Sequence, residues 1–298
     1  MINTVLGTIK ENEVGVTLSH EHICCYSEYL YMMSGEKYLD KERLLATAVS
    51  YLKGIKEKYG LCTFIDCTPI NIGRDIELLK KVSEQSGVNI VCSTGFYYTE
   101  EPVLYNTTKE EFAQHIINDA KAINAGVIKC AVESETISKF NETLLRASAI
   151  AQIKLGIPIV LHTNACNKNG LKALEILLAE GVKPQAVTVG HLSDTDDIEY
   201  INTIAKYGCY IGLDRLYNWE EFINKKIKTI NELCGLGYEE KIILSHDASF
   251  FNGFDAGLKI DKAPRYSCVF EEVLSKLSDE LFEKIMVENP LKMLKCGE

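Results

Sequence analysis

Long apolar runs are absent from this 298-residue sequence. A membrane-spanning helix needs roughly 18 or more consecutive apolar residues, and no such stretch is found. Residues 1–10 also lack the basic segment and apolar core of a secretory signal peptide. We therefore expect a cytoplasmic protein that does not bind a membrane.

Positive charge is also scarce, with 32 Lys and Arg against 42 Asp and Glu and a formal net charge of -10. Nucleic acids and anionic membranes bind basic surfaces, so we expect neither as a partner. A small anionic substrate would have to be held by a few local cations.

Cysteine is plentiful, but the 11 cysteines include no Cys-x-x-Cys pair. Disulfide frameworks belong to small secreted domains and not to a chain of this length and type. We therefore expect reduced, mostly buried thiols.

A Gly-x-Gly-x-x-Gly turn does not follow the first apolar run, which argues against a doubly wound dinucleotide-binding sheet. Instead, short apolar runs rich in β-branched residues recur about every 32 residues, the size of a βα repeat. We predict strands at residues 15–20, 61–68, 89–95, 127–131, 157–163, 186–191, 209–214 and 241–247. We predict helices at residues 41–58, 76–86, 109–124, 142–154, 170–179, 196–206, 219–234, 265–276 and 279–287, with a tail at 289–294. This alternation predicts an α/β fold, a (β/α)8 TIM barrel that forms one domain over residues 1–298.

Ionisable side chains lie in or at the ends of these strands, where the active sites of such barrels are built. Four of the six histidines are among them, together with one lysine and one aspartate: His20, His22, Lys129, His162, His191 and Asp247. His20 and His22 are two residues apart in a strand, so both side chains point the same way. A single such histidine would be an ordinary core residue, whereas the whole set predicts a metal centre. Imidazole and carboxylate ligands suit zinc, manganese, iron, cobalt or nickel.

Lys129 lies inside the apolar segment 126–131, where a charged ammonium group is costly to bury. A neutral amine there can add carbon dioxide to give a carbamate, whose two oxygens can bridge two metal ions. The alternatives are a lysine paired with an acid such as Glu133, and a Schiff-base lysine. Beside four histidines, we interpret Lys129 as the bridging carbamate.

Two further groups of acidic residues are assigned to structure. Glu21 lies between His20 and His22 and should point away from the barrel mouth, where an ion pair or hydrogen bond would hold it. The run 193–197 precedes a helical segment and is typical of a helix N-cap.

Six motifs together identify a family. They are Leu-Ser-His-Glu-His at 18–22, Gly-Val-Ile-Lys at 126–129, Val-Leu-His-Thr at 160–163, Gly-His-Leu-Ser-Asp-Thr-Asp-Asp at 190–197, Gly-Leu-Asp-Arg at 212–215 and Leu-Ser-His-Asp at 244–247. In order and spacing the sequence resembles the phosphotriesterase-like family of the amidohydrolase superfamily over essentially its whole length. The resemblance implies an amidohydrolase-type barrel with two divalent metal ions, zinc being favoured.

The resemblance also implies how the site works. One ion would be held by His20, His22 and Asp247 and the other by His162 and His191, with carboxylated Lys129 and a hydroxide bridging them. Two divalent ions lower the pKa of a bridging water, and one of them polarises the bond that is attacked. Asp247 would then shuttle a proton to the leaving oxygen.

Residues beyond the metal ligands bear on the substrate. Arg215 and the tyrosines Tyr97 and Tyr98 resemble the lactonase branch of the family. Trp219 either lines the leaving-group pocket or begins a helix. The cluster formed by Lys259, Lys262, Arg265 and Tyr266 could bind a substrate phosphate or carboxylate, or lie in a solvated loop.

We therefore expect a hydrolase of small-molecule esters, a lactonase whose substrates could include phosphorylated sugar lactones. The alternatives are a phosphotriesterase or phosphodiesterase, an N-acyl amidohydrolase, and a catalytically silent metal-binding barrel. Barrels of this type often pair, so a homodimer is one of the assemblies that we consider.

Overall fold

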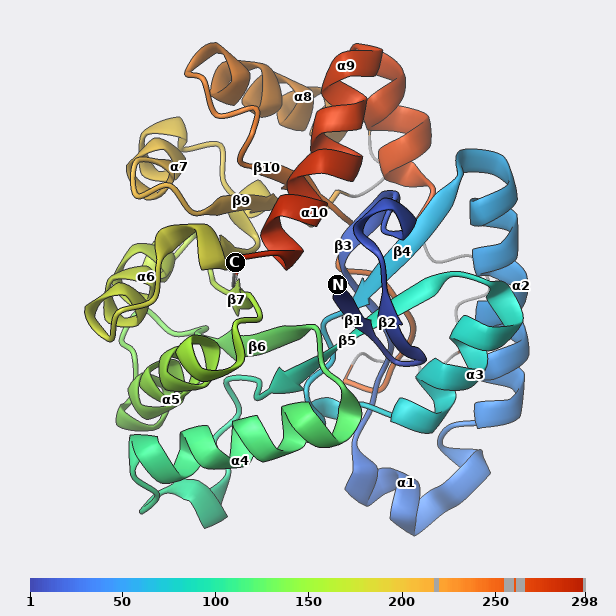
Figure 1. Ribbon diagram of the computed structural model, residues 1–298, viewed down its shortest axis with the longest axis vertical. Helices are drawn as coiled ribbons and strands as arrows, with labels where there is room; N and C mark the ends of the chain where they lie inside the picture. The colour runs from blue at the N-terminus through green and yellow to red at the C-terminus, as the bar shows by residue number, and fades with distance from the viewer. Residues whose placement is uncertain (217–219, 255–259, 261–265, 297–298) are drawn as a thin grey trace.

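The computed structural model describes residues 1–216, 220–254, 260 and 266–296. Its main sheet is parallel, with neighbouring strands in the order β10-β9-β8-β7-β6-β5-β4-β3-β11, and helices surround it (Figure 1). The strands of this sheet are β3 (Val16–Cys25), β4 (Leu61–Asp66), β5 (Asn89–Gly95), β6 (Val127–Ala131), β7 (Ile159–His162), β8 (Val187–Val189), β9 (Tyr210–Leu213), β10 (Ile242–Leu244) and β11 (Ser249–Asn252). A separate antiparallel hairpin consists of β1 (Ile2–Thr4) and β2 (Gly7–Ile9).

The barrel is completed by two short strands in place of the single one predicted at 241–247. β10 pairs with β9 and β11 pairs with β3, so the two ends of the sheet come together. Between them the backbone N–H of Asp247 donates to the carbonyl of His20 at 3.1 Å. Asp247 has a φ of 52°, which interrupts the strand at this point. The predicted (β/α)8 TIM-barrel fold is confirmed.

The helices begin and end at residues suited to those positions. Asp40 and Asp75 accept hydrogen bonds from the first turns of α2 and α3, and Gly60 and Gly87 end these helices in the left-handed conformation. The α-helices are α1 (Glu28–Ser34), α2 (Lys41–Tyr59), α3 (Ile76–Ser86), α4 (Lys109–Ile123), α5 (Lys139–Leu155), α6 (Asn169–Ala179), α7 (Ile198–Ala205), α8 (Glu220–Gly235), α9 (Asp279–Glu283) and α10 (Asn289–Leu294). Single 3-10 turns lie at Glu11–Glu13, Gly35–Lys37, Ile70–Ile72, Pro102–Leu104, Pro184–Ala186, Leu192–Asp194 and Leu274–Lys276.

The last two predicted helices are less regular than expected. π-helical turns occupy Val269–Val273 and Lys284–Glu288. In a π turn each N–H bonds one residue further back than in an α-helix, a difference that apolar periodicity does not reveal.

The barrel interior is filled and closed at its N-terminal end. Val127, Val160 and Ile243 from three strands form one apolar cluster with Ile2 of β1 and Met293 of α10. Figure 1 shows the N-terminal hairpin and α10 lying across the barrel axis. A larger cluster lies between the strands and the surrounding helices. The plugged end leaves the opposite, C-terminal end of the strands for a site.

All 11 cysteines lie in the described part of the chain, and all are free thiols. Most of them are buried, as expected. Within the described residues, no helix has the length and apolarity that a membrane crossing requires.

Candidate metal centre

The six residues predicted to form a metal centre come together at the C-terminal ends of the strands. Five of the side chains are buried and that of Asp247 is 14% exposed. The carboxylate Oδ1 of Asp247 lies 3.1 Å from Nε2 of His22 and 3.7 Å from Nε2 of His20. Lys129 reaches the same point from β6, with its Nζ 2.5 Å from Nε2 of His20. His20, His22 and Asp247 therefore form a group that could hold a metal ion.

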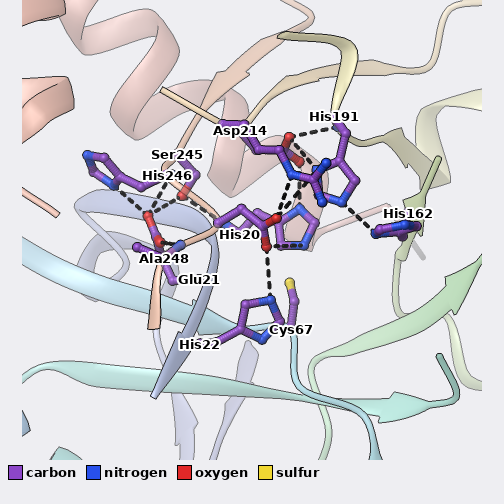
Figure 2. A network of polar contacts seen from close by, with 12 residues as sticks. His20, Glu21, His22, Cys67, His162, His191, Asp214, Ser245, His246 and Ala248 are labelled. Atoms are coloured by element: carbon purple, nitrogen blue, oxygen red, sulfur yellow. Dashed lines mark hydrogen bonds and ion pairs between the residues drawn. The ribbon is translucent and has the colours of Figure 1, made fainter. Parts of the chain in front are cut away.

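His162 and His191 face each other on the other side of the centre (Figure 2). Nε2 of His162 lies 2.8 Å from a carboxylate oxygen of Glu133, and Nδ1 of His191 lies 3.0 Å from one of Asp214. A carboxylate only accepts, so an imidazole with one N–H, the form that binds a metal, uses it in this outward contact. The inward nitrogens, 2.7 Å apart, are then two facing lone pairs. Such a pair is unfavourable unless a cation lies between or beside it, so these donors fit a metal ion.

Asp214, directly after β9, orients two of the histidines. Its Oδ2 lies 2.5 Å from Nδ1 of His20, and its Oδ1 accepts from both the backbone N–H and Nδ1 of His191. Burial raises the pKa of Asp214, but His191 and His20 lower it by more, to well below its usual range. Asp214 is itself close enough to His20 and His191 to be a ligand. Because it already bonds their Nδ1 atoms, we interpret it as the residue that turns their Nε2 atoms inward.

Two residues of the centre have a strained backbone. His191 and Asp247 have φ angles of 62° and 52°, a region that residues other than glycine rarely occupy. The carboxylate of Asp214 holds the backbone N–H of His191, and the carbonyl of His20 holds that of Asp247. Strain of this kind is typical of functional sites, where the surrounding structure maintains it.

Burial keeps two of the imidazoles neutral, as metal ligands must be. Burial and the nearby Lys129 lower the pKa of His20 to about 3. Burial and the neighbouring His191 lower the pKa of His162 to well below its usual value. Burial also lowers the pKa of His22, but contacts with Cys25 and Asp247 outweigh it and raise this pKa to about 10. A metal ion at His22 would therefore have to displace a proton.

Arg215 connects the centre to a second carboxylate. Its Nε donates to Oδ2 of Asp247 and its Nη1 to Asp194, both at 2.7 Å, and its backbone N–H donates to Ser193. Burial raises the pKa of Asp247, but His191, His22 and Arg215 lower it by more, so it stays a carboxylate.

The structure corrects part of the assignment of residues 193–197. Asp197 caps α7 as predicted, by accepting from the backbone N–H of Tyr200. Ser193 and Asp194 instead hold Arg215. They serve the site because the chain makes a 3-10 turn, Leu192–Asp194, before the helix begins.

Two predictions about acidic residues have different outcomes. Glu21 is buried and accepts hydrogen bonds from Ser245, His246 and Ala248, so its structural role is confirmed. Glu133, the alternative partner of Lys129 suggested by the sequence, instead bonds His162 and Asn164.

A pocket of about 320 Å³ opens over the centre. Its lining includes metal-centre residues, the predicted Tyr97, Tyr98 and Arg215, and residues not foreseen from the sequence, such as Cys25, Asn252 and Phe254. The ring of Tyr97 lies edge-on to that of His162, with centroids 5.0 Å apart. Burial, with a smaller effect from Tyr98, raises the pKa of Tyr97, so its hydroxyl stays protonated. The phenol is therefore a hydrogen-bond donor at the wall of the pocket.

The remaining candidates for substrate binding are a buried tyrosine and four residues that the structure does not describe. Tyr266 is fully buried, and its hydroxyl donates to the carbonyls of His22 and Ala248, so it is a core residue and not a substrate contact. Trp219, Lys259, Lys262 and Arg265 lie outside the described residues.

Residues that orient the histidines were missed from the sequence. Asp214 follows β9 just as His162 ends β7, so the strand-end pattern could have found it. Thr68, whose hydroxyl lies 2.8 Å from Nδ1 of His22, ends the strand predicted at 61–68 and lies two residues beyond β4, so the same pattern could have found it. Glu133 lies in a loop and carries no such signal.

Fold and site together define a class, that of (β/α)8 barrels with a candidate metal centre of histidines and carboxylates at the C-terminal strand ends. The family model described as the phosphotriesterase family matches residues 1–294, so the chain belongs to that family. An aryldialkylphosphatase of Saccharolobus solfataricus is 36% identical, with 96% of each chain covered. A phosphotriesterase homology protein of Mycobacterium tuberculosis is 28% identical, and an N-acetyltaurine hydrolase of Xenopus tropicalis 27%; each match covers 98% of this chain and 97% of the relative.

Proposed function

We propose that this member of the phosphotriesterase family is a metal-dependent lactonase with two divalent ions. His20, His22 and Asp247 would hold one ion, and His162 and His191 the other. Lys129 would bridge them as a carbamate: its Nζ forms a bond to the carbon of carbon dioxide and loses a proton. Bound ions would lower the pKa of a water between them and polarise the substrate carbonyl. Zinc is the metal that we favour for this ligand set.

Asp247 is the proton carrier in this proposal. Arg215 holds its Oδ2, its Oδ1 lies 3.1 Å from Nε2 of His22, and the residue lines the pocket. A carboxylate placed there can take a proton from the attacking water and pass it to the leaving oxygen. The ion pair between Arg215 and Asp194 would keep the Asp247 carboxylate in one orientation during the proton transfer.

We infer a lactone substrate from the groups around the pocket that can supply a proton to the leaving oxygen. An alkoxide, which leaves when a lactone opens, is a strong base and needs a proton, whereas an aryloxide leaves without one. Asp247, buttressed by Arg215, and the protonated hydroxyl of Tyr97 both line the pocket. This arrangement is suited to a poor leaving group, and a volume of about 320 Å³ suits a small ester.

Two other substrate classes have support from the relatives. The aryldialkylphosphatase favours phosphotriester hydrolysis, since attack at phosphorus and at carbon can use the same centre. The N-acetyltaurine hydrolase favours cleavage of an N-acyl amide, whose amine also leaves with a proton.

A substrate panel separates these possibilities. Metal-loaded protein is assayed on γ- and δ-lactones with and without a phosphate group, on aryl phosphotriesters and diesters, and on N-acyl amino acids. We expect lactone opening to be fastest and to be lost with a chelator. Faster turnover of the phosphoesters or amides would overturn the lactonase assignment. The variant His115→Ala, which alters an exposed histidine on α4, should match the wild type.

The carbamate is tested at Lys129. Lys129→Ala should lose both metal and activity, because the bridging oxygens are gone. Short carboxylic acids added to this variant should restore part of both, because they can supply two oxygens to the same space. Metal content and lactone turnover are measured with and without added acetate or propionate. Full activity of Lys129→Ala without any acid would remove the carbamate from the mechanism.

A further inference from the structure

Glu133 stands out among the residues around the centre because it lies in a loop and not at a strand end. It follows β6, and its side chain is 38% exposed. Its Oε2 nevertheless bonds Nε2 of the buried His162 at 2.8 Å. A partly exposed glutamate would sample several rotamers unless other contacts restrict it.

Three asparagines that follow β7 in the sequence supply such contacts. Nδ2 of Asn164 donates to Oε1 of Glu133 at 2.7 Å, and Nδ2 of Asn167 donates to the backbone carbonyl of Glu133 at 3.0 Å. Nδ2 of Asn169 donates to the carbonyl of Ser134 at 3.1 Å. The asparagines also bond one another, since Asn164 donates to Asn169 and Asn167 donates to Asn164. We call Asn164, Asn167 and Asn169 the asparagine clamp.

The clamp ties the loop after β6 to the loop after β7, the strand that ends in His162. Asn169 is buried and is the first residue of α6, so one member of the clamp is held in a helix. One carboxylate oxygen of Glu133 is bound by the clamp and the other by His162. The carboxylate therefore has a single orientation relative to the imidazole.

That orientation determines which nitrogen of His162 faces the centre. Because the Nε2–H of His162 donates a hydrogen bond to Glu133, the lone pair of the ring is on Nδ1, which points at His191. In His20 the assignment is reversed, with Nδ1 outward on Asp214 and Nε2 inward. In Figure 2, His191 lies between Asp214 and His162. Asp214 thus serves both sides of the centre, whereas Glu133 serves His162 alone.

We propose that Glu133, held by the asparagine clamp, is a positioning residue that fixes the His162 tautomer and sets the affinity of one metal ion. The inference rests on the proposed two-metal function. Orienting partners of this kind typically contribute about 10–100-fold to metal affinity. Loss of Glu133 should therefore weaken the ion at His162 and His191 about 10–100-fold and leave the ion at His20, His22 and Asp247 bound as before.

The test compares Glu133→Ala and Glu133→Gln with Glu135→Ala, a matched change at an exposed glutamate of the same loop. Zinc is titrated into chelator-stripped protein against a chromophoric chelator. We expect two tight ions in the wild type and in Glu135→Ala. Glu133→Ala should show one tight and one weakened ion, and Glu133→Gln, which keeps an acceptor oxygen, an intermediate result.

A second measurement does not depend on metal. Nitrogen NMR of the stripped protein should show His162 protonated at Nε2 in the wild type and a mixture of tautomers in Glu133→Ala. Two equally tight ions and an unchanged tautomer in Glu133→Ala would overturn the inference alone. A wild type that binds no zinc would overturn the two-metal function and the affinity claim together.

Discussion

Each histidine of the centre uses one ring nitrogen for an orienting contact and turns the other inward. Thr68 orients His22 and Glu133 orients His162. Asp214 orients both His20 and His191. A ring held in this way does not have to lose rotational freedom when an ion binds, so the centre is organised in advance.

The variant Asp247→Asn tests the proposed proton transfer by Asp247. The amide keeps the shape of the carboxylate but cannot take up a proton. Lactone turnover should therefore fall about 10²–10⁴-fold. Turnover of an ester with a p-nitrophenolate leaving group should fall much less, because this group leaves without a proton.

The measurement is kcat on the two substrates at equal metal content, with His115→Ala as the control. Equal losses on both substrates would show that Asp247 acts only as a ligand. An unaltered pH–rate profile for the lactone would also count against the proton transfer.

Gly95, the last residue of β5, has no side chain and so leaves room for the backbone of Lys129 on the neighbouring strand. Its φ is 95°, and a Cβ added there would lie 2.0 Å from the carbonyl oxygen of Lys129. Gly95→Ala should therefore lower the urea midpoint markedly and displace the backbone of Lys129, so that metal content falls as well. Gly54→Ala, on α2 with no atom beyond the adjacent residues and the nearby helix backbone within 4 Å of the added Cβ, is the matched control. It should be neutral or stabilise by up to about 1 kcal/mol. Equal midpoints for the two variants would rule out the close approach at Gly95.

The metal-centre residues could be proposed from sequence because strand ends converge in a barrel and few residue types bind metals. The pairing between loops could not, since the side chains that meet are set by loop conformation. Glu133 illustrates this limit: it lies four residues after Lys129, yet its side chain turns to His162. Asp194 illustrates the same limit, because the 3-10 turn at Leu192–Asp194 brings it to Arg215.

Three consecutive outer helices are joined by one ionic cluster. Lys109 begins α4, Arg146 lies in α5, and both bond the carboxylate of Glu180 at the end of α6. Hydrogen bonds from Lys109 and Arg146 lower the pKa of Glu180. Such a network links helices whose apolar faces already pack on the sheet.

The cluster makes stability depend on acidity. The pKa of Glu180 is lower in the folded state than in the unfolded chain, whose value is about 4.3. The contribution is therefore complete above the unfolded pKa and is lost as the pH falls through the folded one. Glu180→Gln should be less stable than wild type at pH 7, with the difference shrinking below about pH 4. Urea unfolding at pH 7, 5 and 3 measures this, with Glu84→Gln on α3 as an exposed control. A difference that stays constant with pH would exclude the ionic contribution.

Among the helices and strands, the sequence predicted eight strands in the right places, because near-continuous apolar runs mark the strands of a parallel sheet that is covered on both faces. It missed β1 and β2, which form a hairpin outside the βα repeat, and β11, which follows β10 without a helix between them. The π turns were missed because a change of hydrogen-bond partner leaves the apolar pattern unaltered.

The molecule as a whole separates stability from chemistry along the barrel axis. One end is plugged by the N-terminal hairpin and α10, and the other carries the candidate metal centre. Parallel barrels commonly divide their residues in this way.

Ile2→Ala tests this separation. Ile2 is buried among the barrel-interior residues, so its truncation should cost about 2–5 kcal/mol of unfolding free energy. Because the plug is at the far end, kcat on a lactone should be unchanged. Leu6→Ala, at an exposed position of the same hairpin, should alter neither quantity appreciably. A fall in kcat with Ile2→Ala at full metal content would contradict the separation.

We propose that two metal ions make this barrel a hydrolase of lactones. The most direct test is a titration of chelator-stripped protein with zinc, in which the initial rate of lactone opening is followed at each addition. We predict no turnover without zinc and a rise that ends at two equivalents per chain. Turnover by the stripped protein, or a rate that never rises with zinc or any other divalent ion, would contradict the proposed metal-dependent hydrolysis.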